Sequence, residues 1–128
     1  YKIDLSNVIR KNHTIECRIN AENAKDFSPS PGTVKFINVP GGRGVRVDTA
    51  LYTNYKVNPH YDSLILKIVS KGEDRNEAIS IMKRALDEII IDGIDTNIEL
   101  HKWILNQNDF NNGIYNTNWL EKNISKFN

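Results

Sequence analysis

The sequence is poor in cysteine and in long hydrophobic runs. Its 128 residues include a single cysteine, Cys17, so neither an internal disulfide nor a site of several thiolates is possible. Apolar runs such as residues 89–91 fall far short of the roughly 20 apolar residues of a membrane-spanning helix. With no leader-like stretch at its start, the sequence predicts a cytoplasmic protein without a membrane partner.

An excess of charge of one sign is also missing. Seventeen Lys and Arg residues against sixteen Asp and Glu residues leave a formal net charge of +1, and the basic residues are scattered. We therefore predict no nucleic-acid partner. The histidines His13, His60 and His101 lack the His-x-x-x-His spacing, and no Cys-x-x-Cys pair occurs, so no metal site is predicted.

The length corresponds to one domain, residues 1–128, which is large enough to bury a core. The chain begins with Tyr1, and Met82 is its only methionine. We therefore expect a segment of a longer protein.

The first half of the chain has the two-residue period of β-strands. Over residues 13–20 apolar and polar residues alternate, which predicts a strand with Glu16 and Arg18 on its polar face. In the short strand predicted after the glycine-rich turn over residues 40–44, we expect the Arg46 side chain to face away from that of Val45. The further strands are predicted over residues 33–39, 45–48 and 64–69, with a loop over residues 23–32 and a turn over residues 40–44.

The second half changes to the period of an α-helix. Asp74 and Glu77 match a capping box, and the apolar residues after them recur every three or four positions until Asp92-Gly93. A long amphipathic helix is therefore predicted between these two signals.

Two further helices are predicted near the end of the chain. Thr96 and Glu99 repeat the capping signature ahead of an apolar stripe that includes Trp103, and residues 118–124 indicate a short third helix. Strands followed by helices indicate an α+β fold, with a mostly antiparallel sheet in the first half and two to three helices in the second.

Two local patterns resemble catalytic motifs but favour structural roles. Residues 41–44 are glycine-rich, but a strand follows them instead of the helix that a phosphate loop requires, so they predict a turn. His60, Asp62 and Ser63 are the residue types of a hydrolase triad, but neighbours in one extended segment point to opposite faces. Turn and strand-start roles are predicted for them.

Five sequence blocks, in order along almost the whole chain, resemble the C-terminal domain of biotin carboxylase. The blocks are H-T-I-E-C-R-I-N-A-E (13–22), S-P-S-P-G (28–32), P-G-G-R-G-V-R (40–46), Y-D-S-L-I (61–65) and I-D-G-I-D-T-N (91–97). The resemblance implies an ATP-dependent ligase that activates bicarbonate with ATP and transfers the carboxyl group to N1 of biotin on the biotin carboxyl carrier protein.

The resemblance also implies what this chain lacks and what it associates with. The family binds ATP and Mg, and makes most of its bicarbonate contacts, in an N-terminal domain and an ATP-grasp module without counterparts in these 128 residues. We therefore expect the isolated fragment to be inactive. The implied partners are the carrier protein, carboxyltransferase subunits and a second copy of the same chain in a homodimer.

The matching blocks carry the family's site residues onto this sequence. Arg18 corresponds to the catalytic arginine at the ureido oxygen of biotin, which also touches bicarbonate, and Asp62 corresponds to a supporting acid near the same site. Arg46 corresponds to a residue at the homodimer contact, and Arg43 to an interface position that is often aromatic in the family. For Arg18, Arg46 and Asp62 the alternative is a solvated strand charge or surface ion pair.

The family serves several carboxylases. Residues 28–32 (S-P-S-P-G), and residues 120–122 (L-E-K) shortly before the chain ends, resemble a free-standing bacterial subunit of acetyl-CoA carboxylase. This resemblance implies a role in fatty acid biosynthesis. The alternatives are the same domain in a fused pyruvate or propionyl-CoA carboxylase, and a non-catalytic assembly module whose arginines dock a partner.

Overall fold

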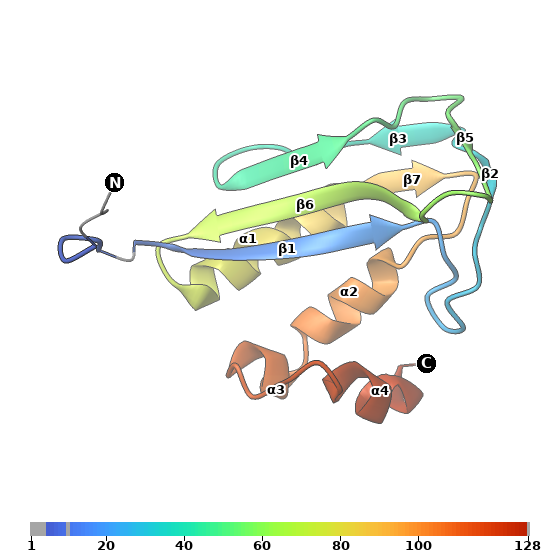
Figure 1. The fold of residues 1–128 in the computed structure, drawn as a ribbon. Helices are drawn as coiled ribbons and strands as arrows, with labels where there is room; N and C mark the ends of the chain where they lie inside the picture. The colour runs from blue at the N-terminus through green and yellow to red at the C-terminus, as the bar shows by residue number, and fades with distance from the viewer. Residues whose placement is uncertain (1–4, 10, 128) are drawn as a thin grey trace.

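Three antiparallel strands form the main sheet of the computed structural model (Figure 1). The central strand β6 pairs with an edge strand on each side, in the order β1-β6-β4. The strands are β1 (His13–Asn20), β4 (Val45–Thr49) and β6 (Leu64–Gly72). The structure describes residues 5–9 and 11–127, and the rest of the predicted domain lies outside the described residues. The strands predicted over 13–20, 45–48 and 64–69 are confirmed, and β6 extends three residues further.

The strand predicted over residues 33–39 is wrong, because this segment forms parts of two separate strands. Strand β2 (Gly32–Thr33) pairs with β5 (Lys56–Val57), and β3 (Phe36–Asn38) pairs with β7 (Ile90–Asp92). The backbone changes partners in between, since the N–H of Val34 donates to the Tyr55 carbonyl and the next N–H donates to the Asp92 carbonyl. The alternation of apolar and polar residues along the chain does not reveal that a segment changes the strand with which it pairs.

The long helix α1 (Arg75–Glu88) begins where the sequence predicts and ends earlier. The Asp74 side chain accepts a hydrogen bond from the Glu77 N–H at 2.9 Å, which confirms Asp74 as the N-cap. The return bond of the predicted capping box is displaced by one residue, because the Glu77 carboxylate accepts from the Glu73 N–H. The helix does not continue to Asp92-Gly93, because Ile89 is already extended, with φ −70° and ψ 132°. The β-branched run that follows forms β7 instead.

The remaining helices are short, and two of them match predicted helices. They are α2 (Ile98–Leu105), α3 (Asn108–Asn111), α4 (Trp119–Asn123) and a 3₁₀ turn, η1 (Ile124–Lys126). The second capping box is wrong: Asn97 is the N-cap of α2, and its side chain makes no capping hydrogen bond. The α+β fold class is confirmed. None of the helices in the described part of the chain is long and apolar enough to cross a membrane.

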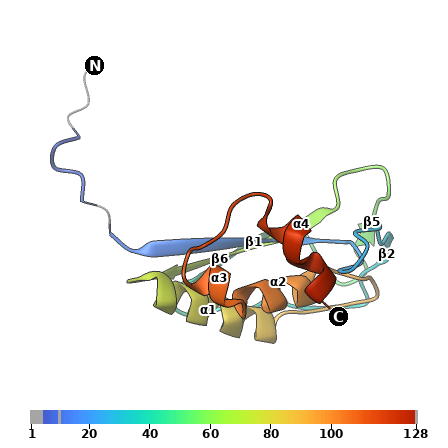
Figure 2. The same ribbon diagram turned by 90° about the horizontal axis from the view of Figure 1, so that it is seen from below.

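The core lies between one face of the main sheet and the helices α1 and α2, which lie on the same side of the sheet (Figure 2). Its fully buried large side chains come mainly from β1, β6 and α1. They include Ile19, Leu66, Ile68, Met82 and Leu86. Within residues 5–9 and 11–127 no helix covers the opposite face of the sheet, so it is the surface on which exposed strand residues lie.

Cys17 lies on the core side of β1 and is 4% exposed. Burial, with a smaller contribution from Glu16, raises the pKa of its thiol to about 12. Because the thiolate is the reactive form, we expect no alkylation of this residue in the folded protein near neutral pH and full alkylation after denaturation. Peptide mass spectrometry measures both, and native labelling as fast as that of an exposed thiol would contradict the buried position.

Candidate functional site

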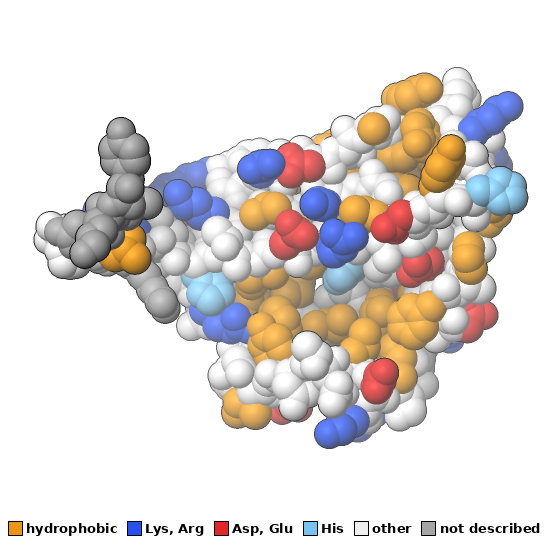
Figure 3. All heavy atoms as spheres, in the orientation of Figure 1, with side chains coloured by type: hydrophobic (Ala, Val, Ile, Leu, Met, Phe, Trp, Pro, Cys, Tyr) orange, Lys and Arg blue, Asp and Glu red, His pale blue; other side chains and the backbone are white. Residues whose placement is uncertain are grey.

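Charged side chains of both signs lie on the face of the sheet that is turned away from the helices (Figure 3). The strand register places the residues in two rows across the sheet. One row holds Arg18, Lys67 and Asp48, and the next holds Glu16, Val69 and Arg46. Arg18 therefore lies on the exposed face of β1, as the alternation predicts, beside Glu16.

The guanidinium of Arg18 is exposed, and none of the ion pairs found in residues 5–9 and 11–127 involves it. Its main chain, in contrast, is firmly held. The Arg18 carbonyl accepts a hydrogen bond from Nε2 of His101 at 2.9 Å and another from Nδ2 of Asn97 at 3.2 Å. Arg18 thus combines a fixed backbone with a cation that is available to a ligand.

Arg46 is engaged with a neighbour on its own strand. Its Nε and NH2 groups donate to the two carboxylate oxygens of Asp48 at 2.9 and 2.8 Å. Hydrogen bonding to Arg46 lowers the pKa of Asp48, and the same contact raises the pKa of Arg46. Sequence analysis missed this pair, although Arg46 and Asp48 are two residues apart and therefore share a strand face. The Arg46 side chain is still 73% exposed.

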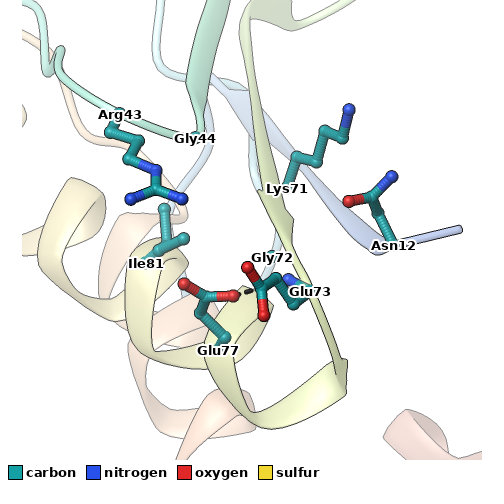
Figure 4. A pocket seen from close by; sticks show the side chains of 8 residues that line it. All are labelled: Asn12, Arg43, Gly44, Lys71, Gly72, Glu73, Glu77 and Ile81. Carbon is teal, nitrogen blue, oxygen red and sulfur yellow. Dashed lines mark hydrogen bonds between the residues drawn. The ribbon is translucent and has the colours of Figure 1, made fainter.

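Arg43 lies away from this face, in the turn before β4. It lines a hollow of about 280 Å³ together with Lys71, Glu73 and Glu77 (Figure 4). The turn requires glycine next to Arg43, since Gly44 has φ +76° and a Cβ there would lie 2.6 Å from the Lys71 carbonyl oxygen. Within the described residues, no hydrogen bond or ion pair joins Arg43 to Arg46.

Asp62 lies in the loop before β6, where its Oδ1 accepts a hydrogen bond from the Leu64 N–H at 2.9 Å. This contact confirms the strand-start role predicted from the local pattern. The carboxylate also lines a hollow of about 110 Å³ with Leu51 and Tyr55. The described part of the structure shows no hydrogen bond or ion pair between Asp62 and Arg18, so it does not bring the two predicted site residues into contact.

Near the end of β1 the structure joins Ser63, which the sequence predicts in a strand-start role, to Glu22 and Asn20, which were not predicted as site residues. The Glu22 carboxylate accepts a hydrogen bond from the Ser63 hydroxyl and another, at 3.3 Å, from Nδ2 of Asn20. The Oδ1 of Asn20 is buried without a partner in the described structure. The described residues contain no group of three or more His, Cys, Asp or Glu side chains arranged to hold a metal ion.

Residues 16–122 match the family described as the biotin carboxylase C-terminal domain. The chain belongs to this family. The match begins at Glu16, inside β1, and contains Arg18, the strands β4 and β6 and the whole of α1 and α2.

Curated relatives and solved structures agree with the family match. The chain is 52% identical over 117 residues to a biotin carboxylase of Pseudomonas aeruginosa, covering 91% of this chain and 26% of that protein. It is 49% identical over 113 residues to a pyruvate carboxylase subunit of Methanothermobacter thermautotrophicus, covering 88% and 23%. The chain thus spans about a quarter of the length of these relatives.

A crystal structure from Hydrogenobacter thermophilus extends the agreement to three dimensions. It is the biotin carboxylase domain dimer of 2-oxoglutarate carboxylase in complex with MgADP, ADP and bicarbonate. The two folds superimpose with a TM-score of 0.89 at 39% identity, covering 92% of this chain and 26% of that one.

Proposed function

We propose that this domain is the C-terminal part of a biotin carboxylase, and that Arg18 supplies the cation that stabilises the biotin enolate during carboxylation by ATP and bicarbonate. The observation that carries the proposal is the exposed Arg18 guanidinium on a strand whose backbone is held from both sides. Biotin arrives on the biotin carboxyl carrier protein. ATP and Mg bind to the parts of the subunit outside these 128 residues.

The chemistry of biotin gives Arg18 its role. Removing the proton from the ureido N1 moves negative charge onto the ureido oxygen, so a fixed cation beside that oxygen lowers the barrier. Arginine suits the position because its guanidinium stays protonated and offers several N–H donors to two oxygens at once, here the ureido oxygen and bicarbonate. Asp62 has a supporting role at the same site once the rest of the subunit is present.

We further propose that the subunit serves acetyl-CoA carboxylase in the cytoplasm, with carboxyltransferase subunits as later partners. The 52% identity to the Pseudomonas aeruginosa protein supports the biotin carboxylase part of this assignment, and the sequence of residues 28–32 favours acetyl-CoA carboxylase. The 49% identity to a pyruvate carboxylase subunit supports the second candidate, a biotin carboxylase that serves pyruvate. Activity of the complete subunit with each purified carboxyltransferase distinguishes the two.

The direct test of the function is Arg18→Ala in the complete subunit, with formation of carboxybiotin from ¹⁴C-bicarbonate as the readout. Unchanged carboxybiotin formation would reject the proposed role of Arg18.

Arg43 and Arg46 are proposed to lie at the homodimer contact of the complete subunit, supported by the dimeric state of the Hydrogenobacter relative. We expect Arg46→Glu to weaken dimerisation about tenfold or more, because the reversed charge meets the partner copy and also repels Asp48. Sedimentation velocity at low concentration measures the effect. The control is Lys102→Glu, which makes the same charge change near Asp87 and Glu99, away from the proposed contact. Equal sedimentation of wild type and Arg46→Glu would contradict the assignment.

A further inference from the structure

Strand β1 lies at the edge of the sheet, so only one of its sides is paired with a strand. The backbone groups on its outer side need other partners. At its carboxyl end these partners come from α2, which begins beside the end of β1 (Figure 1). Two residues of this region, Asn97 and His101, supply them.

The Asn97 side chain occupies the place that a peptide group of a neighbouring strand would take. Its Nδ2 donates to the Arg18 carbonyl at 3.2 Å, and its Oδ1 accepts from the Asn20 N–H at 2.9 Å. The Asn97 N–H donates in turn to the Asn20 carbonyl at 3.3 Å. Asn97 is 7% exposed, so solvent does not compete for these bonds.

His101 lies one helical turn further along α2 and completes the arrangement. Its Nε2 donates to the same Arg18 carbonyl at 2.9 Å, so both lone pairs of this oxygen are used. Burial lowers the pKa of His101, which favours the neutral ring, and the bond to a carbonyl oxygen requires the proton on Nε2. The part of β1 around Arg18 is thus fixed on one side by the pairing of the strand with β6 and on the other by two side chains that bond to the Arg18 carbonyl.

An ordinary N-cap residue would use its side chain on its own helix. Asparagine in this position normally accepts a hydrogen bond from an N–H in the first turn, which contributes roughly 1 kcal/mol. Asn97 makes no such bond and directs its amide to β1. The Asn97 side chain therefore does not stabilise the start of α2 by capping it.

We propose that Asn97 and His101 are positioning residues for Arg18, which hold the backbone of β1 so that the guanidinium meets the ureido oxygen of biotin. The inference rests on the proposed function of Arg18. A small displacement of a catalytic group lowers the rate strongly, and about 1 Å costs on the order of 10²-fold. The polar groups of both side chains are bonded to the β1 backbone, so their effect on the reaction acts through Arg18.

The experiment compares variants of the complete subunit that differ in one hydrogen bond. His101→Leu removes the N–H donor and is expected to lower kcat for biotin carboxylation about tenfold, with little change in KM for ATP. His101→Gln keeps an N–H donor within reach and is expected to restore most of the rate. Equal rates for wild type and His101→Leu would overturn the proposal, and so would equal losses in the leucine and glutamine variants.

A second variant covers the outcome in which His101→Leu does not fold. Asn97→Ser retains a good N-cap for α2, but one hydroxyl is too short to bridge Arg18 and Asn20. We expect a loss of kcat with normal secondary structure by circular dichroism. A wild-type kcat in this variant would overturn the role of Asn97.

A double-mutant cycle separates this proposal from the function on which it rests. If His101 acts through Arg18, then His101→Leu has no further effect on the residual rate of Arg18→Ala. The same fold loss in both backgrounds would overturn the positioning role and leave the proposed function intact. Wild-type carboxylation by Arg18→Ala alone would instead reject the function.

Discussion

Replacing Arg18 by alanine in the complete subunit is expected to lower the rate of biotin carboxylation by about 10²–10³-fold. This range corresponds to a barrier higher by roughly 2.7–4 kcal/mol, the usual cost of losing one group that stabilises a developing oxyanion. Among the described residues, the guanidinium has no ion-pair partner that its removal would leave uncompensated. The loss should therefore appear in the chemical step and not in the stability of the fold.

The matched control is Lys122→Ala, which removes an exposed cation from α4, away from the sheet face that carries Arg18. The rate of this variant should stay near that of wild type if the position of the charge matters and the total charge does not. Arg18→Lys should recover only part of the activity, because an ammonium group does not reproduce the forked donors of a guanidinium. Similar losses in Arg18→Ala and Lys122→Ala would indicate a general electrostatic effect and contradict a specific role.

The largest effect on stability is expected at the centre of the sheet. Ile68 is completely buried in β6, and its register partners are Cys17 on β1 and Val47 on β4. Ile68→Ala should destabilise the domain by about 2–5 kcal/mol, because it removes apolar atoms and leaves a cavity between sheet and helix.

Hydrogen exchange of the β6 and α1 amides in the complete subunit, followed by mass spectrometry, measures this loss. Opening of these segments should become roughly 30-fold more frequent or greater, since each 1.4 kcal/mol is a factor of ten. The conservative control Ile68→Val should cost only about 0.5–1.5 kcal/mol. Exchange in Ile68→Ala at the wild-type rate would show that the core does not depend on this side chain.

Local patterns in the sequence predict those parts of the fold that depend on neighbours in the chain. Alternation places Arg18 on the exposed face and Cys17 in the core, and the capping box of Asp74 marks the start of α1. The local patterns do not predict a strand correctly where its pairing depends on residues that are distant in the sequence. The two-residue strand β2 ends because the backbone changes partners at Val34, and β7 forms because β3 lies beside it.

The same distinction applies to the candidate site. A strand pattern predicts the direction of the Arg18 side chain, but it contains no information about the partners of the Arg18 carbonyl. Asn97 matches the helix-start position in its local sequence, so its contact with β1 is visible only in three dimensions. His101 has no local signal at all, because a single histidine on a helix is compatible with many roles.

The distances along the chain have a consequence for how the domain folds. The hydrogen bonds from Asn97 and His101 to Arg18 span 79 and 83 residues. Contacts at such separations form only after long loops have closed, and this slows folding. During synthesis β1 emerges well before α2 exists, and until then its outer edge is open to pairing with other chains. The strand that carries Arg18 is therefore an unprotected edge strand of the nascent chain until α2 has been synthesised.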